Sequence, residues 1–214
     1  MTAERRQILD RVAAYYTGRL GEFGPSARGV DWASEASQRL RFEQLARLWS
    51  DRPRFSLVDL GCGYGALLDY LRAVGAEVTY VGVDVAPAML EAARARHRDT
   101  PGASFVEDER AVAPGDFAVA SGVFNVKLDV PEARWAEYVL DTLARLDALG
   151  RRGFAFNVLS LYSDPGRRRP DLYYADPLAL FDHLKRRVSP RVALLHDYPL
   201  YEATFLVRKD ERGA

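Results

Sequence analysis

Cysteine and histidine are scarce in this sequence, and long apolar runs are missing. One cysteine, Cys62, and three histidines stand among 214 residues, so no internal disulfide can form and no Cys/His spacing matches a zinc site. No apolar run approaches the roughly 20 residues that a membrane-spanning helix needs. The first 11 residues also lack the apolar core of a signal peptide. The sequence therefore predicts a cytoplasmic protein with no bound metal and no membrane contact.

Net charge is absent too, because 30 Lys and Arg residues balance 30 Asp and Glu residues. A neutral chain has no general attraction to nucleic acid or to anionic lipid, so both are disfavoured as partners. The main hint of an anionic partner is a set of basic runs: Arg151–Arg152, Arg167–Arg169 and Lys185–Arg187. We interpret them first as solvated surface diluted by neighbouring aspartates, with RNA binding as the alternative.

Apolar runs and helix-like stripes alternate from Arg54 onward. Strands are expected at 55–60, 78–84, 103–107, 117–122, 153–159, 191–197 and 202–208, and helices at 66–74, 87–98, 132–149 and 177–188. This alternation favours an α/β fold with a doubly wound, mostly parallel, seven-stranded Rossmann-like sheet. Only a few residues join the last two strands, so the final strand is expected to be antiparallel.

The first 53 residues have a different pattern. A helix is expected over 4–16, a Gly-rich loop over 17–29, and a second helix over about 31–49 with Asp31 as its cap. We therefore divide the chain into an N-terminal helical cap, residues 1–53, and one globular α/β unit, residues 54–214.

The most informative segment is the turn after the first expected strand, Gly61-Cys62-Gly63-Tyr64-Gly65. Glycine permits unusual φ angles and lets a ligand approach the backbone closely. A helix pattern and a second strand follow, and that strand ends in Asp84, 19 residues after Gly65. A carboxylate there can accept hydrogen bonds from both hydroxyls of a ribose. A plain turn with a surface acid is the alternative, but turn, helix and distant acid together favour a nucleoside-binding unit.

The glycine spacing separates two kinds of nucleoside cofactor. Dinucleotide sites favour Gly-x-Gly-x-x-Gly with a helix N-terminus facing a pyrophosphate, whereas this chain has Gly-x-Gly-x-Gly. Asp59 lies two residues before the first glycine. Its carboxylate would repel a pyrophosphate but suits a cation, such as a sulfonium that bears an ammonium group. A nicotinamide-dependent oxidoreductase is therefore disfavoured.

At these residues the chain resembles a known family. Val58–Gly65 resembles motif I of the class I S-adenosylmethionine-dependent methyltransferases, and Gly82–Leu90 resembles the segment that follows it. The resemblance covers about residues 54–209 and implies S-adenosylmethionine (SAM) as cofactor. It implies these cofactor-binding residues: Asp59, Gly61, Cys62 and Gly63 at the turn, Asp84 on the ribose, Val85 and Met89 near the adenine, Glu107 or Asp108 at its amino group, and Ser121 and Gly122 on the opposite side.

The same resemblance implies that the N-terminal cap forms a lid. Arg28–Trp32 and Gln38–Arg41 resemble lid segments of family members that act on small molecules. Tyr16, Trp32, and Gln38 or Arg41 are expected to close over the cofactor, with an arginine meeting its carboxylate. Ordinary helix packing is the alternative for each of these residues.

Candidates for binding the methyl acceptor follow the fourth and fifth expected strands. They are Asn125, Asn157 and Tyr174, with loop caps or core packing as alternative roles. His196, near a strand end, is the candidate general base, although methyl transfer depends mainly on holding donor and acceptor in line. Cys62 lies inside the turn, which argues against a nucleophile.

We therefore predict an enzyme that transfers a methyl group from SAM to an oxygen or nitrogen of a small molecule and leaves S-adenosylhomocysteine (SAH). Nucleoside binding follows from the residues, whereas methyl transfer rests on the resemblance. The alternatives are an RNA or protein methyltransferase and a protein that binds the cofactor without catalysis. The chain lacks the Asn/Asp-Pro-Pro-aromatic signature, so DNA adenine and glutamine side chains are disfavoured as acceptors.

Overall fold

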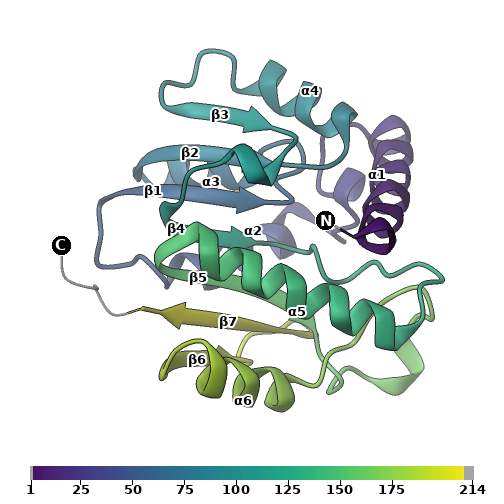
Figure 1. Cartoon of the computed structure of the whole chain (residues 1–214). Helices are drawn as coiled ribbons and strands as arrows, with labels where there is room; N and C mark the ends of the chain where they lie inside the picture. The colour runs from purple at the N-terminus through teal and green to yellow at the C-terminus, as the bar shows by residue number, and fades with distance from the viewer. Residues whose placement is uncertain (1, 210–214) are drawn as a thin grey trace.

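The computed structural model describes residues 2–209 and shows a seven-stranded sheet with helices on both faces (Figure 1). The strands are β1 (Arg54–Leu60), β2 (Glu77–Val83), β3 (Ala103–Val106), β4 (Gly115–Ala120), β5 (Gly150–Leu159), β6 (Arg191–Leu195) and β7 (Glu202–Arg208). Their order across the sheet is β3-β2-β1-β4-β5-β7-β6. β7 is antiparallel to both of its neighbours, and the other pairs are parallel. The predicted Rossmann-like fold with a reversed last strand is confirmed.

Two helical layers enclose the sheet, and a further helix crosses its end. The helices are α1 (Ala3–Phe23), α2 (Glu35–Ala46), α3 (Ala66–Ala73), α4 (Pro87–Arg96), α5 (Glu132–Leu149) and α6 (Pro177–Arg187), with 3₁₀ turns η1 (Arg28–Val30), η2 (Glu109–Ala111) and η3 (Pro165–Arg167). One face of the sheet is covered by α2, α3 and α4, where Leu45 and Leu71 are fully buried. The other is covered by α5 and α6, where Leu146 and Leu184 are fully buried. The central strands are apolar because both of their faces are covered.

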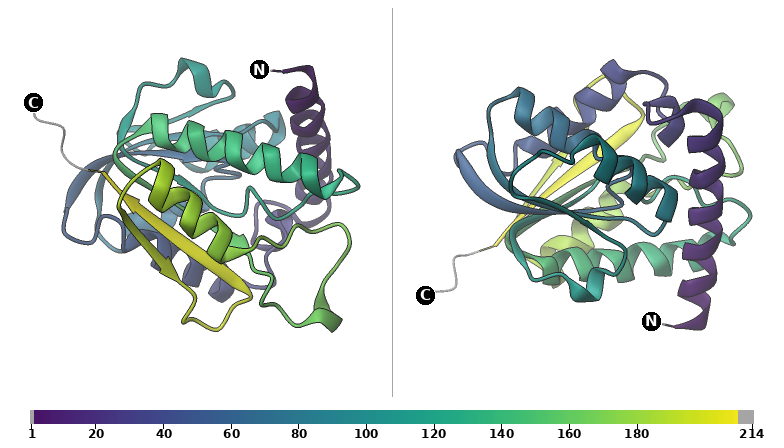
Figure 2. Two further views of the ribbon diagram at one scale, coloured as in Figure 1. Left: turned by 60° about the horizontal axis from the view of Figure 1, so that its bottom comes forward. Right: turned by 90° about the horizontal axis from the view of Figure 1, so that it is seen from above.

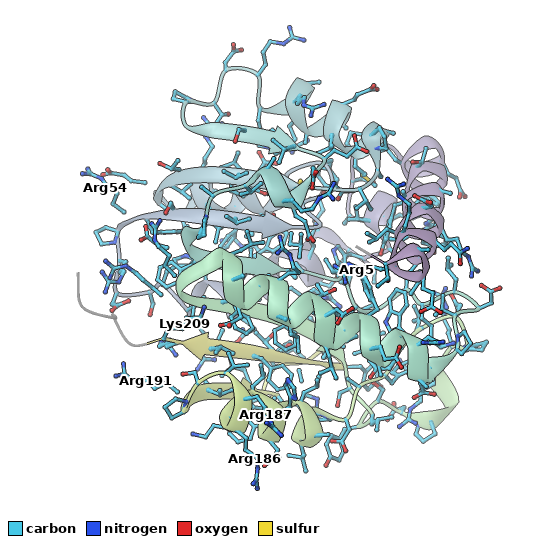
Figure 3. All side chains as sticks on the ribbon, in the orientation of Figure 1. Arg5, Arg54, Arg186, Arg187, Arg191 and Lys209 are labelled. Atoms are coloured by element: carbon cyan, nitrogen blue, oxygen red, sulfur yellow. The ribbon has the colours of Figure 1, made fainter. Side chains whose placement is uncertain are left out.

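The crossing helix, α1, lies over the carboxyl ends of the parallel strands, as Figures 1 and 2 show. The chain passes from β3 to β4 through η2 without a longer helix, and the first half of α1 packs beside α5. Arg5 lies between these two helices (Figure 3), donates to the Thr142 hydroxyl at 3.2 Å and stacks over the Tyr138 ring. In doubly wound folds this edge of the sheet holds the ligand, and here α1 forms its roof.

The first helix is longer than the sequence predicted. It continues through Gly18 and Gly21 and ends at Gly24, which has a left-handed φ of 65° and donates to the Leu20 carbonyl. Each internal glycine makes helix formation about 1 kcal/mol less favourable than alanine does. For this reason the sequence predicts a loop from residue 17. Packing of Tyr16 and Leu20 against the α4 side keeps the chain helical across these glycines.

The second helix begins later than predicted, and Asp31 is not its cap. Ser34 and Ser37 cap α2 reciprocally, each hydroxyl accepting from the other's backbone N–H at 3.1 and 3.2 Å. Asp31 has a left-handed φ of 63° and accepts hydrogen bonds from the Tyr15 hydroxyl at 2.5 Å. Its carboxylate therefore fixes α1 to the segment that follows it.

The proposed division at residue 53 places α2 in the cap, but α2 packs against β5 and β7. The segment over the carboxyl edge consists of α1, η1 and the residues up to Trp32, and we call residues 3–32 the lid. Within residues 2–209, no helix combines the length and apolar character that crossing a bilayer requires.

Candidate active site

The turn between β1 and α3 is shaped by its glycines and tied to β2. Gly61 has a φ of 77°, and a Cβ there would lie 2.4 Å from Cγ2 of Val123. Only glycine fits this position without moving the chain. The backbone N–H groups of Gly61 and Cys62 both donate to the Val83 carbonyl, at 2.7 and 3.0 Å. The turn therefore stands directly beside the end of β2.

Asp84 comes immediately after β2 and faces this turn. Its Oδ2 accepts from the Gly63 N–H at 2.8 Å, and its Oδ1 accepts from the Ala86 N–H at 2.9 Å. Burial raises the pKa of the Asp84 carboxyl above its usual range, and the backbone donors oppose that rise. An ionised carboxylate has about four acceptor positions. The positions that these backbone donors leave free can accept from a ligand, as the predicted contact with ribose hydroxyls requires.

A cavity of about 360 Å³ opens over the turn and beneath α1. Its volume lies within the range of small-molecule and cofactor sites. Lid residues, strand ends and α5 all contribute to its wall. The predicted cofactor residues that line it are Tyr16, Trp32, Gly61, Gly63, Asp84, Val85, Met89, Glu107, Asp108, Ser121 and Gly122.

Two hydroxyl groups on this wall have no hydrogen-bond partner among residues 2–209. The Oγ of Ser121, directly after β4, is buried and unpaired. The Tyr16 hydroxyl on α1 makes no hydrogen bond to another described residue, and burial together with nearby Asp31 and Asp84 raises its pKa. A fully buried polar atom such as the Ser121 Oγ normally has a partner. These two are therefore suited to the polar groups of a nucleoside or amino-acid ligand, and the residues present fit such a cofactor.

Asp59 and Cys62, both predicted at the cofactor, are buried behind the turn and do not line the cavity. The Tyr80 hydroxyl donates to Asp59 Oδ2 at 2.5 Å. Burial raises the pKa of Asp59 to about 7, against the lowering effect of this hydrogen bond. Burial also raises the pKa of the Cys62 thiol, so it stays protonated and is a poor nucleophile.

Arg41 does not reach the cavity, contrary to the expectation that it meets a cofactor carboxylate. It is 7% exposed, and its Nε and Nη2 donate to Glu202 at 2.8 and 2.9 Å. Its charge is therefore already paired. The guanidinium stacks on Trp32, which does line the cavity.

The predicted acceptor residues also have partners elsewhere. Asn125 and Asn157 are buried and donate to Glu202, and the Tyr174 hydroxyl accepts from the Arg169 N–H at 3.0 Å. His196 is exposed beyond the end of the edge strand β6, and its ring lies near that of Tyr162. None of these four side chains lines the cavity, so the structure does not bring the predicted base to the predicted cofactor site.

Several wall residues were missed in the sequence. On α1 they are Arg5, Leu9 and Val12, and on α5 they are Tyr138 and Thr142. Both sets recur at intervals of three or four residues, which places each on one helical face. That periodicity was visible in the sequence. The periodicity does not distinguish a helical face that lines a cavity from one that packs in a core.

His97 holds the end of the glycine turn, and its protonation should loosen the fold. Its Nε2 lies 3.0 Å from the Gly65 carbonyl and donates to it, while the buried Nδ1 has no partner among residues 2–209. Burial lowers the pKa of His97, so the folded state binds the proton less readily than the unfolded chain. The stabilising effect of a neutral His97 is thus full above about pH 6.5 and lost as the pH falls below it.

We expect the wild-type urea midpoint to fall between pH 7.5 and 5.5 more than that of His97→Gln, which can still donate to Gly65 but does not titrate. Comparing the two proteins removes from the measured slope the contributions of other groups, such as the carboxyls whose pKa is raised by burial. Parallel pH profiles for the two proteins would contradict this role.

Comparison with known proteins places this geometry in a family. A family profile described as a methyltransferase domain matches residues 58–149. A Mycobacterium tuberculosis protein with the provisional name methyltransferase Rv1506c is 54% identical over 155 residues, which are 72% of this chain and 93% of that protein.

Solved structures share the fold at low sequence identity. Magnesium protoporphyrin IX methyltransferase from Synechocystis PCC 6803, with bound SAM, has a TM-score of 0.63 and 13% identity over 98% of this chain and 99% of its own. DhpI in complex with SAH has a TM-score of 0.62 and 16% identity over 96% of this chain and 98% of its own. With the mycobacterial relative aligned over almost its whole length, the chain belongs to the class I S-adenosylmethionine-dependent methyltransferases, enzymes whose methyl donor is SAM.

Proposed function

We propose that this methyltransferase transfers the methyl group of SAM to an oxygen or nitrogen of a small-molecule acceptor. The observation that carries the proposal is the cavity of about 360 Å³ under the lid, with the buried and unpaired Ser121 hydroxyl on its wall. The cavity is covered by α1 and Trp32, and a covered cavity of this size suits a compact acceptor. It does not offer the open groove that a polynucleotide needs.

In this proposal the cofactor lies along α1. Residues 5 to 16 of that helix line the cavity, a length of about 16 Å at 1.5 Å per residue. Asp84 accepts the ribose hydroxyls, Met89 and Val85 pack on the adenine, and Gly61 and Gly63 let the methionine portion approach the backbone. Tyr16 and Ser121 offer their free hydroxyls to polar groups of cofactor or acceptor.

SAM supplies a methyl group already activated by its positive sulfur. The chain's part is to hold acceptor and donor in line and to exclude water, effects that contribute several kcal/mol in well-oriented reactions. The Tyr16 hydroxyl is protonated at neutral pH, and its raised pKa makes it a still weaker base. It therefore orients an acceptor without removing its proton. An acceptor with an acidic hydroxyl or a neutral amine suits such a site.

The basic residues support a small acceptor over RNA. Arg186 lies on the outer side of α6 and Arg54 at the amino end of β1, both far from α1 (Figure 3). Each is paired, Arg186 with Asp182 and Arg54 with Glu77. Paired cations at these distant positions add nothing to a basic surface beside the cavity, which a nucleic acid acceptor would require.

Titration calorimetry of the full chain with SAH and with NADH tests the cofactor part. We expect SAH to bind at one site per chain and NADH not to bind. A panel of phenols, carboxylic acids and amines with radiolabelled SAM then tests the acceptor class. Methylation of RNA with a steep salt dependence would overturn the small-molecule proposal, and tight SAH binding with no methylation of any acceptor would favour a non-catalytic binding protein.

A further inference from the structure

Glu202, at the start of β7, is a fully buried carboxylate outside the cavity that receives four N–H donors. Arg41 on α2 donates from Nε and Nη2, at 2.8 and 2.9 Å. Asn125, after β4, donates from Nδ2 at 3.2 Å, and Asn157 on β5 donates from Nδ2 to the other oxygen. One carboxylate thus joins segments of the chain that lie up to 161 residues apart.

Two of these donors reach the cavity wall on their other side. The Arg41 guanidinium carbon lies 3.9 Å from the centroid of the Trp32 ring. The Asn157 Oδ1 accepts from the Gly122 N–H at 3.1 Å. Trp32 and Gly122 both line the cavity and pack on each other, since a Cβ on Gly122 would lie 2.5 Å from the indole. The Glu202 network therefore holds a contact between the lid and the end of β4.

We propose that Glu202 is a positioning residue for the end of the site formed by Trp32 and Gly122. It orients Trp32 through Arg41 and the Gly122 backbone through Asn157, so that the lid closes on β4 in one arrangement. This inference rests on the proposed cofactor site. A buried ion pair stabilises a fold no better than apolar residues of similar size. Holding the wall in place gives this pair a role that apolar residues could not fill.

The key test separates folding stability from cofactor affinity. Glu202→Gln leaves the Arg41 charge buried and unpaired, so we expect both a lower urea midpoint and an SAH affinity at least about 10-fold weaker by calorimetry. In Arg41→Met/Glu202→Gln no charge is unpaired, so the urea midpoint should recover. The SAH affinity should stay weak, because Trp32 has lost the guanidinium that orients it. Recovery of affinity together with stability would overturn the proposal and make the network purely structural.

Leu184→Ala is the matched control, because it removes a fully buried side chain of α6 away from the cavity. It should lower the urea midpoint strongly and change SAH affinity less than about 2-fold. Asn157→Ala keeps the ion pair and serves if Glu202→Gln does not fold. It frees the Gly122 N–H, so SAH affinity should fall several-fold. Unchanged affinity in that variant would also overturn the proposal.

Tryptophan fluorescence gives a direct readout of the wall. SAH should change the emission of the wild type, and Trp32→Phe should lose most of that change. In Glu202→Gln the change should shrink as well, since the indole is no longer held against Gly122. An undiminished change in Glu202→Gln would contradict the proposal. Failure of the wild type to bind SAH would instead refute the proposed cofactor site, so the two failures are distinguishable.

Discussion

Asp84→Ala should weaken SAH binding by about 100-fold or more, and the variant should still fold. In the proposed site the carboxylate accepts from the two ribose hydroxyls, while it also fixes the N–H groups of Gly63 and Ala86. Hydrogen bonds to a charged group contribute about 1.5–3 kcal/mol each. Losing two of them accounts for the expected factor. Titration calorimetry measures the affinity, and circular dichroism checks that the variant is folded.

Asp108→Asn is the matched control, an acid on the same cavity wall. Its side chain is 48% exposed and forms an ion pair with Arg110 at 2.8 Å. Arg110 lowers the pKa of the Asp108 carboxyl to about 2. Because this carboxylate already has a partner and is solvated, its removal should weaken SAH binding less than about 10-fold. Equal losses in both variants would show that Asp84 has no special place at the ribose.

Asp59→Asn should stabilise the protein at alkaline pH by up to about 4 kcal/mol. Burial raises the pKa of Asp59 to about 7, whereas an unfolded chain has an aspartate pKa of about 3.9. The folded state therefore holds the proton more tightly. Its stability is full below about pH 4 and falls as the pH rises to about 7, at about 1.4 kcal/mol per pH unit. Urea unfolding at pH 5 and pH 8 should show this slope in the wild type and a flatter profile in Asp59→Asn.

Asp59→Asn should also weaken the binding of SAM, the cationic form of the cofactor. A positive sulfur and ammonium bound at the turn favour the ionised form of Asp59, so SAM affinity should rise by up to about 10-fold between pH 6 and pH 8. SAH lacks the sulfonium charge and should respond less. In Asp59→Asn the preference for SAM over SAH should shrink and its pH dependence should largely disappear. A variant that discriminates between them as the wild type does would mean that Asp59 serves the fold alone.

A buried acid that costs stability behind a proposed cofactor site would be a compromise between stability and function. Tyr80 reduces the cost by donating to Asp59 at 2.5 Å. Tyr80→Phe leaves the carboxylate without this donor, so it should raise the Asp59 pKa further and steepen the pH dependence of unfolding.

The alternation of apolar runs and amphipathic stripes determined the fold on its own. Strands buried on both faces must be nearly continuous apolar segments, and the few residues between β6 and β7 exclude a parallel pair. The sequence also predicted the glycine turn and the position of Asp84 at the end of the second strand. Their geometry depends on backbone φ angles and on short hydrogen bonds between neighbouring strand ends, such as that from Gly63 to Asp84.

Only the tertiary structure decided how the remaining polar side chains are used. Arg41 has the right charge for a cofactor carboxylate, but Glu202, 161 residues away, is its partner. Asn157 lies inside β5 and not at its end, and Asn125 lies in the loop after β4. Both donate to the same carboxylate. His196 falls on the far edge of the sheet. The physical reason is that a strand, a helix or a turn follows from local periodicity and local residue types, whereas a charged or amide side chain takes whichever buried partner the packed chain brings within hydrogen-bond distance.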